Sequence, residues 1–204
     1  MMVKIKLCGL SRPEDIAEAN ALMPDYIGFV FARKSKRYVP PEEAARLRAL
    51  LDPGIAAVGV FVNAPEAQVA ALLNSGTIQA AQLHCSEDAA YIRRLRALTD
   101  GELWQAFRVS GPEDLARAAA SEADRILLDN GPGGTGERFD WGLLAGFTAR
   151  PFLLAGGLYP ENVREAVQAV RPWGVDVSSG IESDGRKDPE KMRAFVKAVR
   201  EAEL

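Results

Sequence analysis

VKIKLCGLSRPED, residues 3–15, joins a short strand-like run to the start of a helix, and the same unit recurs along the chain. In this stretch apolar side chains alternate with lysines and then a cysteine, which is typical of a strand with two different faces. Period two places Lys6 and Cys8 on one face and the apolar side chains on the other. Residues 9–15 carry the glycine, proline and acidic residues of a turn into a helix. We therefore expect a strand that ends at Cys8 and a helix directly after it.

Strand-length apolar runs recur eight times, and most are followed by a stretch with helical spacing. Ser11, Asn63 and Ser110 each precede a glutamate by three positions, which predicts helix N-caps there. The helix after the sixth run is expected to be short and partly loop. The expected strands cover residues 3–7, 26–31, 55–62, 79–83, 103–109, 125–128, 152–155 and 174–177.

Alternation of strands and helices with short connections requires a parallel sheet. Eight repeats within 204 residues match a compact (β/α)8 TIM barrel. We expect one such domain over residues 1–204. A doubly wound open sheet is the alternative, but the G-x-G-x-x-G of its dinucleotide-binding form is missing after the first run.

The composition is that of an ordinary globular protein, with 48% hydrophobic and 26% charged residues. A formal charge of −3 gives no general attraction to nucleic acid. The N-terminus has no apolar signal region and no run reaches membrane-spanning length, so we expect a cytoplasmic protein without a membrane partner. Two distant cysteines give no disulfide framework.

In a barrel, chemistry belongs at the carboxyl ends of the strands, and two side chains there can handle protons. Cys8 ends the first run, where a thiol can act as proton acceptor or nucleophile, although a free cysteine often only packs. Asp129 directly follows the sixth run and shares a face with Leu127. It can act as a general acid if its pKa is raised, or it can simply cap a turn.

A basic loop and two turns at the same end offer anion-binding groups. After the second run, Arg33, Lys34, Lys36 and Arg37 form either a carboxylate-binding site or a solvated basic loop. The turns after the seventh and eighth runs are the usual phosphate address of a barrel, because exposed amides, glycines and hydroxyls gather there. These turns contain Gly156, Gly157, Ser178, Ser179 and Gly180.

Four further positions have open readings. His84, the only histidine, lines a site or belongs to the core, and without further ligands nearby it makes a poor metal site. Cys85 is expected to pack. Asp176 shares a face with Ser178 and is predicted to form an ion pair with Lys6 across the closing strands, since a buried lysine needs a partner. Residues 130–141, with four glycines, are expected to form a flexible loop over the mouth.

Ten motifs in the right order resemble the phosphoribosylanthranilate isomerase family of tryptophan biosynthesis. One departure is notable: Cys85 stands where that family typically has glycine, which leaves the backbone of this loop open. The motifs are KLCGL (6–10), GFVFARKSKRYV (28–39), VGVFVN (58–63), QLH (82–84), LLDN (127–130), GGTG (133–136), FDW (139–141), LAGGLYPENV (154–163), VDVSSGIE (175–182) and GRKD (185–188).

The resemblance implies a barrel enzyme that performs an Amadori rearrangement of a phosphoribosyl substrate without cofactor or metal. It further implies that Cys8 is the general base, Asp129 the general acid and Arg37 the partner of the anthranilate carboxylate, with phosphate at the two glycine-containing turns. His84 and Asp176 are candidate site-lining residues from their positions in the sequence, and His84 stays open between the site and the core. A thiol pKa lowered only modestly, toward neutrality, would suffice for this role.

Three questions stay open at this point. A related isomerase of histidine synthesis, or a dual-substrate enzyme, is the first alternative, but its base is typically aspartate, so Cys8 favours the anthranilate substrate. A non-catalytic barrel that binds a phosphate ligand is the second. The oligomeric state is left between monomer and homodimer.

Overall fold

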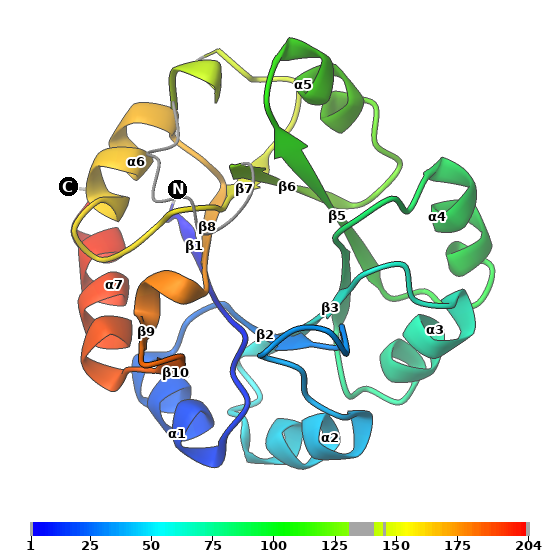
Figure 1. Ribbon diagram of the computed structural model, residues 1–204, viewed down its shortest axis with the longest axis horizontal. Coiled ribbons are helices and arrows are strands. Elements are labelled where there is room, and N and C mark those ends of the chain that lie inside the picture. Colours follow the sequence, from blue (N-terminus) through cyan, green and yellow to red (C-terminus); the bar gives the residue numbers. More distant parts are fainter. Residues whose placement is uncertain (1, 131–140, 145, 203–204) are drawn as a thin grey trace.

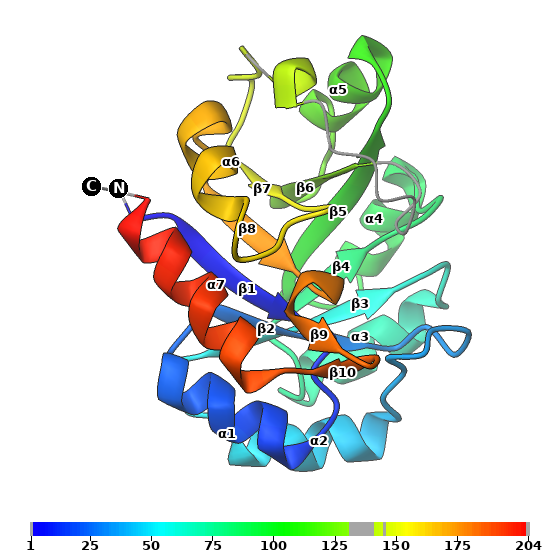
Figure 2. The ribbon, with the colours of Figure 1, turned by 60° about the vertical axis from the view of Figure 1, so that its left-hand side comes forward.

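The computed structural model describes residues 2–130, 141–144 and 146–202. Eight parallel strands follow one another around a closed barrel, and β8 pairs with β1 to close it (Figure 1). The predicted (β/α)8 barrel is therefore confirmed, and the open doubly wound sheet is wrong. The helices surround the barrel, and a short hairpin follows β8 (Figure 2).

The strand positions agree with the expected runs to within two residues. Between the sixth and seventh strands, the described residues contain one 3-10 turn, η1, which agrees with the short helix expected there. The strands are β1 Lys4–Cys8, β2 Tyr26–Val30, β3 Ala56–Phe61, β4 Ala80–Leu83, β5 Glu102–Val109, β6 Arg125–Asn130, β7 Phe152–Leu154, β8 Gly174–Val177, β9 Glu182–Ser183 and β10 Arg186–Lys187. The helices are α1 Pro13–Leu22, α2 Pro41–Leu50, α3 Glu66–Asn74, α4 Ala89–Arg96, α5 Pro112–Ala119, η1 Trp141–Leu144, α6 Val163–Val170, η2 Ser179–Ile181 and α7 Pro189–Glu201.

The predicted N-caps Ser11, Asn63 and Ser110 are wrong. At α1 and α5 a proline takes the first helical position, so the helix starts later than the serine. An aspartate in the first turn, not the predicted glutamate, then accepts the orphan backbone amides. Asp15 accepts from Ser11 N at 2.9 Å, and Asp114 accepts from Ser110 N at 2.7 Å. α3 begins after Pro65, beyond Asn63.

The strands bury two different faces. Side chains such as Ile5 and Leu7 pack outward against the helices in the main core. Inside the barrel a smaller cluster, which includes Trp104 and Leu127, fills the lumen. Tyr26 closes this packing from the amino-terminal end of the strands, with its ring 5.0 Å from that of Trp104. Because side chains fill the lumen at the amino-terminal end of the strands, a substrate is expected to bind at their carboxyl ends.

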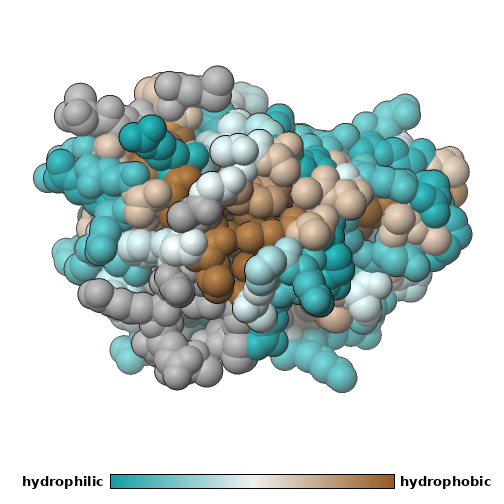
Figure 3. Space-filling view, turned by 90° about the horizontal axis from the view of Figure 1, so that it is seen from above, coloured by the Kyte–Doolittle hydropathy of each residue, from teal (hydrophilic) through white to brown (hydrophobic). Residues whose placement is uncertain are grey.

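The outer surface varies around the barrel. The side that carries α5 and η1 in Figure 1 shows apolar residues near its middle and hydrophilic residues around them (Figure 3).

A cavity of about 800 Å³ lies at the amino-terminal end of the strands, lined by residues that include Met2, Phe152 and Trp173. None of the described helices is both long and apolar enough to span a membrane.

Candidate active site

Strand β1 delivers a lysine and a cysteine to the lumen, as period two predicts. Lys6 is fully buried, and its Nζ lies 3.0 Å from Asp176 Oδ1 on the neighbouring strand β8. The predicted ion pair is thus confirmed, and its cause is register, because Lys6 and Asp176 are direct partners across the closing seam. Cys8 is one layer nearer the mouth and is 7% exposed.

The thiol of Cys8 occupies a space that glycine leaves open. Gly28 is its partner on β2, and a Cβ at this position would approach Cys8 Sγ to 2.6 Å. Burial raises the pKa of Cys8, and the carboxylate of Asp176 raises it further, while the charges of Lys6 and Lys187 lower it. The pKa of this thiol is therefore raised and not lowered toward neutrality, because desolvation exceeds the effect of the cations.

Asp129 and His84 meet at the mouth, on β6 and directly after β4. His84 Nε2 lies 3.4 Å from Asp129 Oδ2, and the side chains are 38% and 26% exposed. His84 is therefore not a core residue. Its other nitrogen, Nδ1, lies 3.1 Å from the Nε2 of the buried Gln82. A carboxyl group beside an imidazole at this distance can exchange protons with it after a small adjustment.

Arg37 is engaged by a residue that sequence reasoning missed. Its Nε and Nη2 donate to the two carboxylate oxygens of Glu182 at 2.5 and 2.9 Å. Lys187 Nζ donates to the same carboxylate at 2.7 Å. Glu182 and Lys187 face each other in the β9–β10 hairpin, whose turn holds Asp184 and Gly185. An Asp-Gly pair is typical of a hairpin turn, so the pairing of Glu182 with Lys187 across the hairpin could have been predicted from the sequence.

The two turns expected at the phosphate site lie against each other. Gly156 and Gly157 have φ values of 82° and 65°, which favour glycine. A Cβ on Gly180 would overlap the carbonyl oxygen of Leu158, so only glycine allows the turn after β8 to approach the turn after β7. The short helix η2, which includes Ser179, follows directly.

The side chain of Ser178 is hydrogen-bonded to strand β1, which carries Cys8. Its hydroxyl donates to the carbonyl oxygen of Cys8 at 3.1 Å, and Lys187 Nζ donates to the hydroxyl at 3.3 Å. The Lys187 ammonium also donates to the Ser178 carbonyl at 2.8 Å. This serine therefore links the hairpin to β1, and its hydroxyl has two protein partners.

The remaining expectations concern Cys85, metals and the glycine-rich loop. Cys85 is exposed, so the expectation that it packs is wrong. Its φ is not positive, so a side chain is accepted without strain where the resembling family has glycine. Within residues 2–130, 141–144 and 146–202, no group of three or more potential ligands could hold a metal. The predicted flexible loop falls largely on residues 131–140, outside the described residues.

The chain is similar in sequence and in fold to known isomerases over nearly its whole length. The family model described as N-(5'phosphoribosyl)anthranilate (PRA) isomerase matches residues 5–198. The enzyme of that name from Thermoanaerobacter sp. (strain X514) is 44% identical, and the match covers 98% of both chains. The crystal structure of the isomerase from Thermotoga maritima is 37% identical, with a TM-score of 0.91, and covers 98% of this chain and 100% of that one.

A further solved isomerase, 37% identical with a TM-score of 0.88, is in complex with reduced 1-(o-carboxyphenylamino)-1-deoxyribulose 5-phosphate; the match covers 98% of this chain and 100% of that one. The matches extend over nearly the whole barrel, including every strand that contributes to the mouth. The chain therefore belongs to the N-(5'-phosphoribosyl)anthranilate isomerase family.

Proposed function

We propose that Cys8 and Asp129 carry out the phosphoribosylanthranilate isomerisation of this chain as general base and general acid. The overall reaction is the Amadori rearrangement of tryptophan biosynthesis that the family performs. It converts N-(5'-phosphoribosyl)anthranilate into 1-(2-carboxyphenylamino)-1-deoxyribulose 5-phosphate. The observation that carries the assignment is the position of Cys8, which ends β1 on the lumen side between the ammonium groups of Lys6 and Lys187.

Asp129 begins the reaction in this proposal. In its protonated form it donates to the furanose ring oxygen, while the anilino nitrogen pushes electrons toward C1. The ring opens and a protonated Schiff base forms. His84, 3.4 Å away, is placed to return a proton to the carboxylate afterwards.

Cys8 completes the reaction by removing the C2 proton. The Schiff base acidifies this carbon, and the product of deprotonation is an enolamine that tautomerises to the ketone. Burial raises the pKa of the resting thiol, so the base needs help at this step. The positive charge of the Schiff base supplies it, together with Lys6 and Lys187, because cations favour the thiolate.

Two anion-binding regions hold the substrate in this proposal. The Arg37 guanidinium receives the anthranilate carboxylate, since a guanidinium fork matches a carboxylate in shape and charge. The backbone amides around Gly157 and Gly180, with Gly156, Ser178 and Ser179, receive the phosphate. Asp176 does not contact the substrate in this proposal; its carboxylate pairs with the buried ammonium of Lys6 and neutralises its charge.

The test is replacement of Cys8 by serine. Turnover is expected to fall by about 10² to 10⁴, the usual contribution of a general base. Affinity for the reduced product analogue should stay nearly unchanged, because the substitution removes one sulfur atom and no anion-binding group. Cys85→Ser is the matched control, since that thiol is exposed and its substitution should leave turnover intact. Unchanged turnover in Cys8→Ser would remove Cys8 as the base.

Substrate choice and assembly are tested with the same protein. Turnover of the phosphoribosyl aminoimidazole of histidine synthesis, compared with the anthranilate substrate, measures specificity. We propose a monomer or a homodimer, because one solved relative is described as a dimeric isomerase from Thermotoga maritima. Light scattering of the purified chain measures its mass directly.

A further inference from the structure

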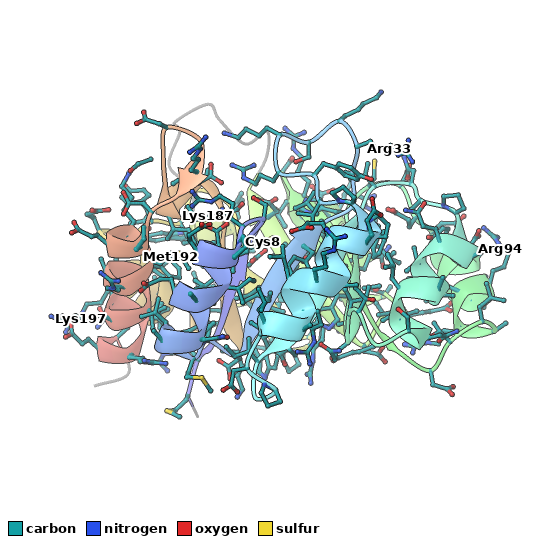
Figure 4. The ribbon with its side chains drawn as sticks, turned by 90° about the horizontal axis from the view of Figure 1, so that it is seen from below. Cys8, Arg33, Arg94, Lys187, Met192 and Lys197 are labelled. Carbon is teal, nitrogen blue, oxygen red and sulfur yellow. The ribbon has the colours of Figure 1, made fainter. Side chains whose placement is uncertain are left out.

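The β9–β10 hairpin places a buried carboxylate among cations beside the proposed base. Lys187 and Cys8 come from opposite ends of the chain yet lie near each other (Figure 4). The side chain of Glu182 is 6% exposed and that of Lys187 is 2% exposed. Burying charges this deeply costs free energy unless each is paired with an opposite charge. The pairing within the cluster therefore determines which further charged group can bind there.

The cluster contains more positive than negative charge. Among the residues that the structure describes, Glu182 is the one carboxylate of the cluster. It contacts the ammonium of Lys187, the guanidinium of Arg37 and, at 3.5 Å, the exposed ammonium of Lys36. Even without Lys36, two cations share a single anion. The spare positive charge favours the entry of a second anion at this place.

The donors of Arg37 are only partly used. A guanidinium carries five N–H groups, and Glu182 takes one from Nε and one from Nη2. Among the described residues, Nη1 donates to none. The stem of Arg37 is also fixed, because a Cβ on Gly9 would lie 2.6 Å from Arg37 Cδ, so the stem runs directly against the backbone that follows Cys8. Apart from the bond of Nη2 to Glu182, the edge formed by Nη1 and Nη2 therefore has no partner in the described part of the chain.

We propose that Glu182 is a positioning residue that determines specificity for a carboxylated substrate. It holds the Nε–Nη2 edge of Arg37, so that the Nη1–Nη2 edge is fixed in place to receive a second carboxylate. Lys187 compensates the charge of Glu182 and ties the hairpin to Cys8 through Ser178. This inference rests on the proposed function, in which Arg37 binds the aromatic carboxylate of the substrate.

The experiment compares two ligands in calorimetry. One is reduced 1-(o-carboxyphenylamino)-1-deoxyribulose 5-phosphate, and the other is the same compound without its ring carboxylate. The dissociation constant of the ligand without carboxylate, divided by that of the carboxylated ligand, is the ratio that measures the preference for the carboxylate. Glu182→Gln is expected to lower this ratio by about tenfold, since a misplaced fork loses the second of two charge-assisted hydrogen bonds. Affinity for the ligand without carboxylate should stay nearly constant.

Two more variants separate positioning from general damage. Glu18→Gln is the matched control, because Glu18 is a buried carboxylate that accepts from Arg193 at 2.6 Å between α1 and α7, away from the mouth. It should leave the ratio unchanged. Arg37→Lys should lower the ratio as well, and adding Glu182→Gln to it should lower the ratio no further.

Glu182→Asp covers the case in which the glutamine variant does not fold. It keeps the charge beside Lys187 but withdraws the carboxylate from Arg37 by one methylene, so the ratio should again fall. An unchanged or increased ratio in the folded Glu182 variants overturns this inference. Failure of the proposed function gives a different result, namely wild-type protein that does not turn over the anthranilate substrate.

Discussion

The pH dependence of stability in Glu182→Gln tests the ion-pair cluster independently of catalysis. Burial by itself raises the pKa of a carboxyl group, but Arg37 and Lys187 lower the pKa of Glu182 from 4.5 to about 2. At 1.36 kcal/mol per pKa unit, this difference is worth about 3 kcal/mol of unfolding free energy at neutral pH. Because the folded-state pKa is the lower one, the contribution is complete above about pH 5 and is lost as the pH falls toward about 2.

Glutamine does not titrate, so the stability difference between wild type and Glu182→Gln must shrink in acid. We expect it to narrow by about 2 kcal/mol between about pH 6 and about pH 3. Urea denaturation followed by circular dichroism measures the unfolding free energy of both proteins at each pH. Glu122→Gln serves as control, because Glu122 forms an exposed ion pair with Arg93, and exposed pairs contribute little to the unfolding free energy.

A difference between wild type and Glu182→Gln that stays constant over this pH range would refute the reasoning. It would mean that the Glu182 carboxyl keeps an ordinary pKa despite its two buried contacts. The cluster would then exert no net field on its carboxylate, and the argument for a fixed Arg37 edge would lose its electrostatic support.

Two further predictions concern the lysines near Cys8. Lys187→Met should raise the pKa of Cys8 further, because the lost charge lowers it in the wild type, so alkylation of Cys8 at a given pH should slow in a Cys85→Ser background. A faster reaction would contradict this. Lys6→Met should destabilise the protein by about 3 to 5 kcal/mol, since it leaves Asp176 unpaired in the lumen, and adding Asp176→Leu should recover most of the loss in urea denaturation.

The faces of the strands could be predicted from the sequence because a strand has only two of them. Once Ile5 and Leu7 are assigned to the helices, Lys6 and Cys8 must point into the lumen. Closure of eight strands then makes β8 the neighbour of β1, which brings Asp176 to Lys6. Pattern and topology together were enough for this contact, without any knowledge of distances.

Contacts made by loops and the degree of burial could not be predicted in the same way. The guanidinium of Arg37 could point to solvent or to substrate, and its actual partner Glu182 lies 145 residues further along the chain. The pKa of Cys8 depends on a balance between desolvation and cations that a sequence does not show. The N-caps failed for a local reason, since a proline moved each helix start beyond the serine.

The charge at the mouth connects binding with base strength. Arg37 and Lys187 attract anions to a protein whose overall charge is −3, and Lys187 also lowers the pKa of Cys8. A bound carboxylate and phosphate oppose this effect, so substrate binding by itself favours the neutral thiol. In the mechanism proposed above, the protonated Schiff base reverses the balance, because it puts a positive charge next to Cys8 only after Asp129 has opened the ring. In this order the thiolate is favoured at the step that needs it, and a resting thiol with a raised pKa is compatible with an efficient base.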